Sequence, residues 1–169
     1  MRTNDAVDEI QHQWGRVRPE LDLDGIAVVG RVLRSAALIV QRSDEVLARH
    51  GLSRGEFDIL AALRRSGRPQ SPGTLRTISL ASGPATTKRL KSLAGRGLIV
   101  RAANPSDGRG VLISLTSPGI ALVDEVLPVQ LDAERELLAG IEPGERPAVV
   151  ESLRRVLSSI EHAGSHGQN

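Results

Sequence analysis

The stretch from Leu98 to Leu115 constrains the fold most, because the hydrophobic pattern changes its period there. Residues 98–101 (LIVR) and 111–115 (VLISL) are rich in β-forming residues, and the segment between them contains Asn, Pro, Asp and Gly. Two such runs around a turn-rich loop predict a β-hairpin. On both sides of this stretch, apolar residues recur at intervals of three and four, as in amphipathic helices. The sequence therefore predicts a mostly α protein with one small β-hairpin.

Helix boundary signals divide the part before the hairpin into five helices. Asn4 can cap the first helix, which Pro19 ends. Ser53 and Glu56 have the spacing of a capping box, and Ser82 can cap a later helix. We expect helices, in chain order, at 4–17, 26–49, 53–65, 74–80 and 82–95.

After the hairpin, Ser117 and Pro118 open a long helix, which Pro128 is expected to kink. Gly140 and Pro143 separate it from a last helix. The apolar stripe of that last helix consists of Val149, Val150, Leu153, Val156, Leu157 and Ile160.

The order of these elements indicates the fold class. A short helix and a capped successor joined by a brief turn are typical of a helix-turn-helix, and a hairpin directly after it is typical of a wing. We predict N-terminal helices over 1–50, a winged helix-turn-helix over 51–117, and C-terminal helices and a tail over 118–169. The terminal helices have more apolar surface than one small head needs, which indicates dimerisation through them.

Composition excludes several classes of function. The 169 residues include no cysteine, so a disulfide scaffold, a thiolate zinc site and a thiol redox sensor are excluded. The four histidines lack ligand spacing, and neither a nucleophile–base pair nor a phosphate-binding glycine loop occurs, so we expect no metal, no cofactor and no enzymatic activity. No stretch has the length of a membrane span and no signal peptide precedes the first helix, so we expect a cytoplasmic protein. The net charge of +2 does not by itself indicate nucleic acid; the distribution of charge has to do so.

Several motifs resemble those of the MarR family of winged-helix regulators. The hairpin carries Asp107-Gly108-Arg109, then Val111, then Leu115-Thr116 and Gly119, as the wing of that family does. The segments 50–60 (HGLSRGEFDIL) and 87–101 (TKRLKSLAGRGLIVR) also match. Trp14 followed by RPELDLDG resembles the urate-responsive subgroup, whose members add a helix bearing a tryptophan. The resemblance implies a DNA-binding regulator.

The candidate DNA contacts lie on the helix after Ser82 and on the hairpin. The outer face of that helix is small, polar and basic, and can enter a major groove. An arginine on the hairpin can enter a minor groove, with Asp107 orienting Arg109. The alternatives are an ordinary solvated helix face and a surface ion pair in a tight turn. The predicted DNA-binding residues are Ser82, Pro84, Thr87, Lys88, Lys91, Asp107 and Arg109.

The subgroup resemblance also implies a ligand site. It implies that Arg89 links the recognition helix to a pocket, that Asp58 is its acidic partner, and that Trp14 covers the site. Arg101 is a second candidate for binding an anion. The alternatives are that Asp58 favours a helix N-terminus, that Trp14 is a core anchor, and that Arg101 contacts phosphate.

Together these observations predict a ligand-responsive regulator, a repressor that binds palindromic duplex DNA as a homodimer. The resemblance implies release by a small anionic metabolite such as urate, xanthine or an aconitate-like carboxylate. Two alternatives stay open: a winged-helix DNA-binding protein without a small-molecule effector, and a winged-helix module for protein contacts.

Overall fold

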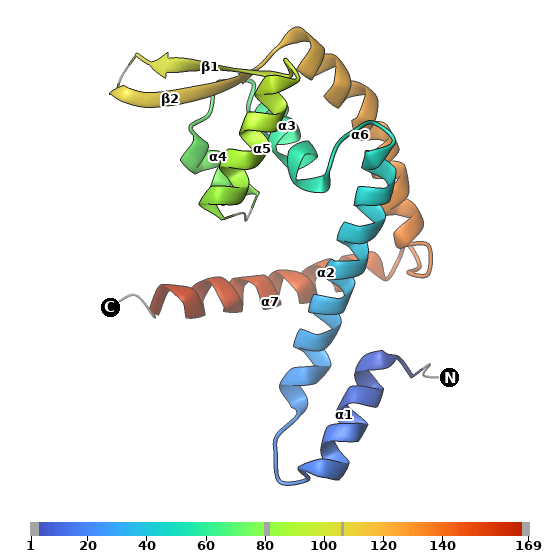
Figure 1. Ribbon diagram of the computed structural model, residues 1–169. Helices are drawn as coiled ribbons and strands as arrows, with labels where there is room; N and C mark the ends of the chain where they lie inside the picture. Colours follow the sequence, from blue (N-terminus) through green and yellow to red (C-terminus); the bar gives the residue numbers. More distant parts are fainter. Residues whose placement is uncertain (1–3, 80–81, 106, 167–169) are drawn as a thin grey trace. The chain divides into compact units, whose positions relative to one another are not determined.

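The computed structural model describes residues 4–79, 82–105 and 107–166, and divides the chain into two compact units (Figure 1). The first unit extends to Ala133 and the second begins at Glu134. The elements are α1 (Ala6–Val17), α2 (Asp24–Ala48), α3 (Arg54–Ser66), α4 (Pro72–Ile78), α5 (Gly83–Gly95), β1 (Ile99–Asn104), β2 (Asp107–Leu115), α6 (Ser117–Leu137) and α7 (Arg146–His166). The predicted fold class, mostly helical with one two-stranded hairpin, is confirmed.

The core of the first unit is built around α3. Ile59 and Leu60 have no accessible surface, and Phe57, Ala61 and Leu63 are at most 6% exposed. Sequence periodicity predicted one buried side, yet Ile59 and Ala62 are buried as well, because neighbours surround α3. A helix that is apolar on most of its circumference belongs in a core. The side chains that cover it come from five other elements and include Leu47, Leu75, Leu90, Leu93, Ile113, Val123 and Val126.

Short-range signals start and end most helices where the sequence predicts. Ser53 and Glu56 form a reciprocal capping box at the start of α3, and Ser82 Oγ accepts the N–H of Ala85 at the start of α5. Gly51 and Gly97 have positive φ angles of 67° and 68°, which suits glycine after the ends of α2 and α5.

Two helix starts differ from the sequence prediction. Asp5, not Asn4, caps α1, because the returning acid Asp8 lies three residues after position 5 and accepts the N–H of Asp5 at 2.9 Å. α4 begins at Pro72, not at Thr74, since Ser71 Oγ caps it and proline suits the first helical position. The helix predicted to kink at Pro128 continues through it as α6.

The hairpin is longer than predicted. β1 and β2 pair from Ile99 with Leu115 to Ala103 with Val111, and then Asn104 pairs with Asp107. The register therefore shifts, and residues 108–110 form an irregularity on β2, where Gly108 and Gly110 can supply the conformations of a bulge. Strand pairing thus extends to Asp107, although the sequence predicted loop up to residue 110.

The hairpin is fastened to the helices at its base. Gln70, in the loop before α4, exchanges two backbone hydrogen bonds with Ile113, of 2.8 and 3.0 Å. Gly119 lies in the first turn of α6, where an added Cβ would be 2.1 Å from the carbonyl oxygen of Leu98. Only glycine allows α6 to begin so close to β1, which gives a physical reason for the glycine after Leu115-Thr116.

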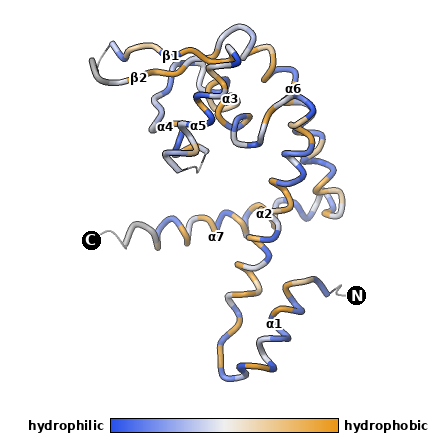
Figure 2. The backbone as a smooth tube through the Cα atoms, viewed as in Figure 1, coloured by the Kyte–Doolittle hydropathy of each residue, from blue (hydrophilic) through white to orange (hydrophobic). Residues whose placement is uncertain are grey.

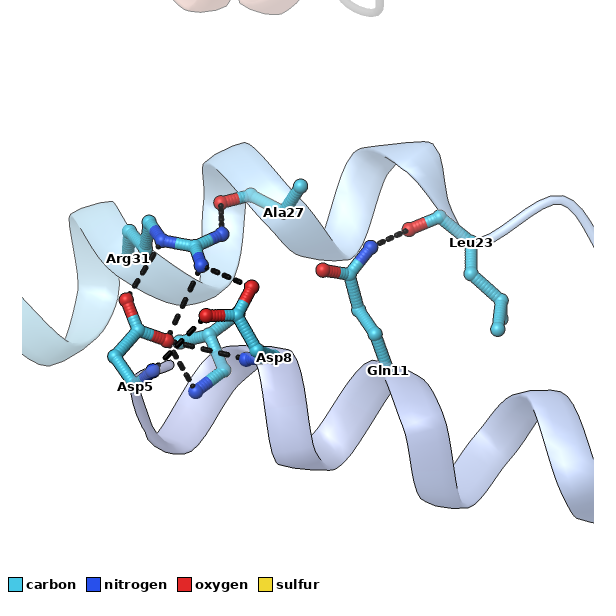
Figure 3. A network of polar contacts seen from close by, with 7 residues as sticks. Asp5, Asp8, Gln11, Leu23, Ala27 and Arg31 are labelled. Atoms are coloured by element: carbon cyan, nitrogen blue, oxygen red, sulfur yellow. Dashed lines mark hydrogen bonds and ion pairs between the residues drawn. The ribbon is translucent and has the colours of Figure 1, made fainter. Parts of the chain in front are cut away.

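α1 folds back along the first half of α2 and is held there mainly by Arg31 (Figures 1 and 3). The guanidinium of Arg31 donates to the carboxylates of Asp5 at 2.8 Å and Asp8 at 2.6 Å. The backbone N–H of Asp8, the N–H of Val7 and Arg31 lower the pKa of Asp5, although its partial desolvation acts the other way. Val7, 2% exposed, fills the space beside Gly30. These contacts make α1 and α2 one hairpin of helices.

The second unit consists of the end of α6, a turn and α7. Arg146 holds the turn, since its Nε donates to the carbonyl of Ile141 at 3.2 Å and its Nη2 to that of Leu138 at 3.3 Å. Large apolar side chains of α7 are exposed in a single chain, among them Val150, Leu153, Leu157 and Ile160. Within the described ranges, no helix combines the length and the apolarity that crossing a membrane requires.

Arg31→Ala should loosen α1 without unfolding the core around α3. The variant removes the two ion pairs to Asp5 and Asp8, so the amides of α1 should exchange hydrogen roughly several-fold faster, as for exposed ion pairs of modest strength.

Lowering the pH should also loosen α1, because the pKa of Asp5 is lowered in the folded state. The contribution of the Asp5 carboxylate to stability is present above the ordinary carboxyl pKa of about 4 and is lost as pH falls through the pKa of Asp5 in the folded state.

Hydrogen exchange followed by mass spectrometry measures both effects, and Arg34→Ala, an exposed arginine on the same helix, is the matched control. Equal exchange of α1 in the Arg31→Ala and Arg34→Ala variants would show that Arg31 does not hold α1.

Candidate nucleic-acid interface

α5 separates its buried and exposed residues as the sequence predicts. Thr86, Leu90 and Leu93 are at most 3% exposed and face the core. The residues of the opposite side are exposed: Pro84, Thr87, Lys88, Lys91 and Gly95. An exposed helix face with small residues, a hydroxyl and two ammonium groups can approach phosphates and base edges without steric hindrance.

The start of α5 is tightly organised. Ser82 Oγ accepts the backbone N–H of Ala85, and the hydroxyls of Thr86 and Thr87 donate to the carbonyls of Ser82 and Gly83 at 3.0 Å. Pro84 occupies the second position of the helix, where no backbone donor is needed. This first turn therefore presents an ordered N-terminus to solvent, and such N-termini attract phosphate.

Arg76 of α4 is a candidate contact that sequence reasoning missed. It is exposed and borders a shallow hollow between α4 and the start of α5. The hollow is lined by Pro72, Gly73, Arg76, Gly83, Thr86 and Thr87. The only signal in the sequence was an arginine in the short helix, which is indistinguishable from a solvated residue until α4 and α5 are packed together.

Asp107 and Arg109, the predicted minor-groove pair, have a described backbone only. Both belong to β2, and Asp107 pairs with Asn104 at the end of the ladder. Their side chains lie outside the described part of the chain. Arg101, on the other strand, is exposed and opposite Ile113.

Arg89 projects from α5 onto the first turn of α3. A Cβ added to Gly55 would lie 2.2 Å from Cζ of Arg89 and 2.4 Å from its Nε, so the guanidinium rests directly on the backbone at Gly55. Asp58 lies three residues further along α3, on the same side of that helix as Gly55. Arg89 and Asp58 therefore both adjoin the first turn of α3, and the partnership that the resemblance implies between them stays a prediction.

The carboxylate of Asp58 is nevertheless paired with a different arginine. Arg54 donates from Nε to Asp58 at 2.9 Å and from Nη1 to Ser43 Oγ at 3.0 Å. The described contacts include no hydrogen bond or ion pair between Asp58 and Arg89. Sequence reasoning did not identify Arg54, although its spacing of four residues from Asp58 is typical of helical ion pairs.

Trp14 lies near the N-terminal end of α2, whereas Asp58 lies near the C-terminal end of that helix. It is 48% exposed on α1, where nearby Gln11 donates to the carbonyl of Leu23 at 3.2 Å. Arg54 and Asp58 instead adjoin Ser43, which is 20 residues along α2, or about 30 Å of helix. A single chain does not bring Trp14 to Asp58 and Arg89, so the predicted cover over the site requires a second chain.

Metal chemistry has no support from side-chain clusters. Among the described residues, no group of three or more histidines, aspartates or glutamates is placed to hold a metal ion.

Comparisons with known proteins identify relatives in sequence and in fold. Residues 50–110 match the model of the MarR family. The chain is 35% identical over 157 residues to the HTH-type transcriptional regulator PecS of Dickeya dadantii, covering 92% of each chain, and 29% identical over 140 residues to the HTH-type transcriptional repressor NicR of Pseudomonas putida, covering 80% of this chain and 86% of NicR. Its fold is similar to that of Bordetella bronchiseptica BpsR, with a TM-score of 0.65 and 30% identity over 76% of this chain and 97% of BpsR. The structure of BpsR describes regulation of its DNA binding by 6-hydroxynicotinic acid.

Lys88→Ala and Lys91→Ala should each weaken binding to duplex DNA while leaving the fold intact, because both side chains are exposed and neither fills the core. If each contacts one phosphate, the slope of log affinity against log salt should fall by roughly one per lysine. Fluorescence anisotropy over a salt series measures this slope. Arg155→Ala, which removes an exposed arginine of α7, is the control, and slopes equal to that of the control would exclude the outer face of α5 from the interface.

Proposed function

Because the chain belongs to the MarR family of transcription regulators, we propose that it is a repressor that binds palindromic duplex DNA as a homodimer and is released by a small anionic metabolite. The family consists of DNA-binding regulators, so the chain is a regulator of transcription and not an enzyme. The observation that carries the proposal is the exposed outer face of α5, with Lys88 and Lys91, on a helix whose other side is anchored in the core.

Repression follows from the way such a protein would occupy DNA. An ordered helix in the major groove and a hairpin beside it bind a short site, and two copies related by a two-fold axis bind a palindrome with higher affinity. In this proposal Ser82, Pro84, Thr87, Lys88 and Lys91 meet the major groove. Asp107 and Arg109 meet the adjacent minor groove, and a repressor bound in this way hinders transcription.

The apolar surface of α2 supports the homodimer. Val29, Leu33 and Val40 are 54%, 66% and 46% exposed, and with Ala36 they form a seam with spacings of four, three and four residues. Figure 2 shows the hydrophobic residues that recur along this helix. Seams with this spacing pack helix against helix. Packed antiparallel on its own copy, the seam brings the large Leu33 against the small Ala36 of the partner chain.

The same antiparallel arrangement would complete the effector site. The seam is centred between Leu33 and Ala36. In an antiparallel pair, the first half of α2, which α1 lies beside, would therefore be opposite the region around Ser43 in α2 of the partner chain. Trp14 of one chain would then cover Asp58 and Arg89 of the other. In the proposal α7, with its exposed apolar stripe from Val149 to Ile160, also contributes to dimerisation.

Two arginines whose side chains lie near the start of α3, one from α3 and one from α5, support an anionic effector. Arg54 and Arg89 both adjoin a helix N-terminus, where the helix dipole also favours negative charge. Arg101 is a further candidate to bind the anion. An anion that draws Arg89 away from Gly55 would favour a different orientation of α5, and a ligand with this preference shifts the population away from the DNA-binding state. Candidates are urate, xanthine and an aconitate-like carboxylate.

DNA footprinting tests the proposed repressor. On the DNA upstream of the protein's own gene, the wild-type chain should protect two half-sites centred about 10 base pairs apart, because each head occupies one turn of the duplex. The Lys88→Ala/Lys91→Ala double variant serves as the control of weakened binding. Protection of one half-site only, or of none, contradicts binding as a dimer.

Tryptophan fluorescence tests the effector site. Trp14 is the only tryptophan, so urate, xanthine or trans-aconitate bound beneath it should quench or shift its emission and should release operator DNA. Arg89→Ala should abolish both responses and should still bind operator DNA, since Lys88 and Lys91 remain. Arg65→Ala, an exposed arginine at the end of α3, should respond as the wild type does.

The opposite pattern would refute this assignment. If Arg89→Ala eliminates DNA binding while the same anion still changes the Trp14 emission, Arg89 contacts DNA and the pocket lies elsewhere.

A further inference from the structure

Three side chains on one side of α5 contact the segment where α3 begins. Arg89, Ser92 and Arg96 are spaced by three and four residues, so they lie on one side of the helix. We call these three residues the α5 seam. Ser92 Oγ donates to the carboxylate of Glu56 at 2.7 Å, and Arg96 Nη1 donates to the carbonyl of Gly51 at 2.7 Å. The α5 seam is polar, whereas the side of α5 formed by Thr86, Leu90 and Leu93 packs into the core.

The contact of Arg89 differs from the other two because it is a steric contact and not a hydrogen bond. Its guanidinium occupies the space that a side chain at position 55 would fill, 2.2 Å from an ideal Cβ. Glycine is a weak helix former, and position 55 lies in the first turn of a helix with a complete capping box. Helix formation alone would therefore favour alanine at position 55, so the packing of Arg89 supplies the reason for glycine.

Charge pairing does not provide the same restraint. Asp58 already accepts a hydrogen bond from Arg54, which is itself bound to Ser43 Oγ. The described contacts include none between Arg89 and this carboxylate, and the head of Arg89 rests on the backbone of Gly55. If a side chain were added at position 55, the guanidinium, being the end of a flexible chain, would move aside while the helix remained.

From these contacts we infer that Gly55 is a positioning residue, which makes the seat for Arg89 and thereby adds a restraint on the orientation of α5 against α3. The inference rests on the proposed role of α5 as the helix that binds DNA. Lys88 and Arg89 are about 100° apart around the helix, so any rotation that frees the α5 seam also moves the outer face. Gly55 would thus affect operator recognition without touching DNA.

A double-mutant cycle tests this inference, with Gly55→Ala, Arg89→Ala and the double variant. Gly25→Ala is the matched control, because Gly25 is likewise the second residue of its helix, α2, and a Cβ at this exposed position has no neighbour within 4 Å. Two quantities are measured for each protein: hydrogen exchange of the α5 amides without DNA, and the ratio of operator affinity to affinity for unrelated duplex at one salt concentration.

Gly55→Ala should speed exchange in α5 without lowering the melting temperature, and should reduce the affinity ratio by roughly two- to fivefold, at the lower end of couplings between residues in contact. In the Arg89→Ala background it should cause no further change. A loss of fold in Gly55→Ala that Arg89→Ala relieves also supports the seat, because it traces the damage to the same clash.

Three results would overturn the inference: values for Gly55→Ala equal to those of Gly25→Ala, an effect of the same size with and without Arg89, or a loss of fold that persists in the double variant. Failure of the proposed function is distinguishable from these results. A wild-type chain that does not prefer operator DNA refutes the proposed function. Hydrogen exchange of the α5 amides in the free variants still shows whether Gly55 positions Arg89.

Discussion

Burial of α3 on almost every side is the constraint on which the rest of the DNA-binding head depends. Its apolar residues occupy most of the helix circumference, so α2, α4, α5, the hairpin and α6 each pack against a different part of it. Fully burying an aliphatic side chain such as Ile59 or Leu60 contributes about 1.5–3 kcal/mol. The middle of α3 is therefore enclosed, and the polar contacts of this helix lie towards its two ends.

Those ends determine how the head is held together. At the C-terminal end, Arg64 donates to both oxygens of Asp124 at 2.8 and 3.0 Å and so joins α3 to α6. At the N-terminal end, burial alone would raise the pKa of Glu56, but hydrogen bonds from Ser92 and Ser53 lower it below the ordinary value. The carboxylate is therefore charged in the folded state and joins α3 to α5. Its contribution to stability is present above the ordinary carboxyl pKa and is lost as pH falls through the folded value.

Local interactions explain what could be predicted from the sequence. The capping box of Ser53 and Glu56, the cap at Ser82 and the division of α5 into a buried and an exposed side depend on residues within one or two turns, and all are confirmed. The hairpin was predicted too short, because Gly108 and Gly110 belong equally to a loop and to a bulge in a strand.

Contacts between distant segments explain what could not be predicted. The seat of Arg89 on Gly55 and the separation of Trp14 from Asp58 depend on how α5 and α1 pack against other helices. Asp58 illustrates the same limit: the resemblance implied Arg89 as its partner, whereas the structure pairs its carboxylate with Arg54.

We propose that the outer face of α5 enters the major groove in each half of a dimer. Directed DNA cleavage is the most direct experiment on this arrangement. The chain has no cysteine, so Lys88→Cys carries a single iron chelate that cleaves nearby DNA. On operator DNA we expect two cleavage clusters centred about 10 base pairs apart, with little cleavage from the same chelate on Glu125→Cys, an exposed position of α6 in the same unit as α5. Absence of cleavage from position 88 under conditions of full binding, or the same pattern from position 125, would show that the outer face of α5 does not enter the groove.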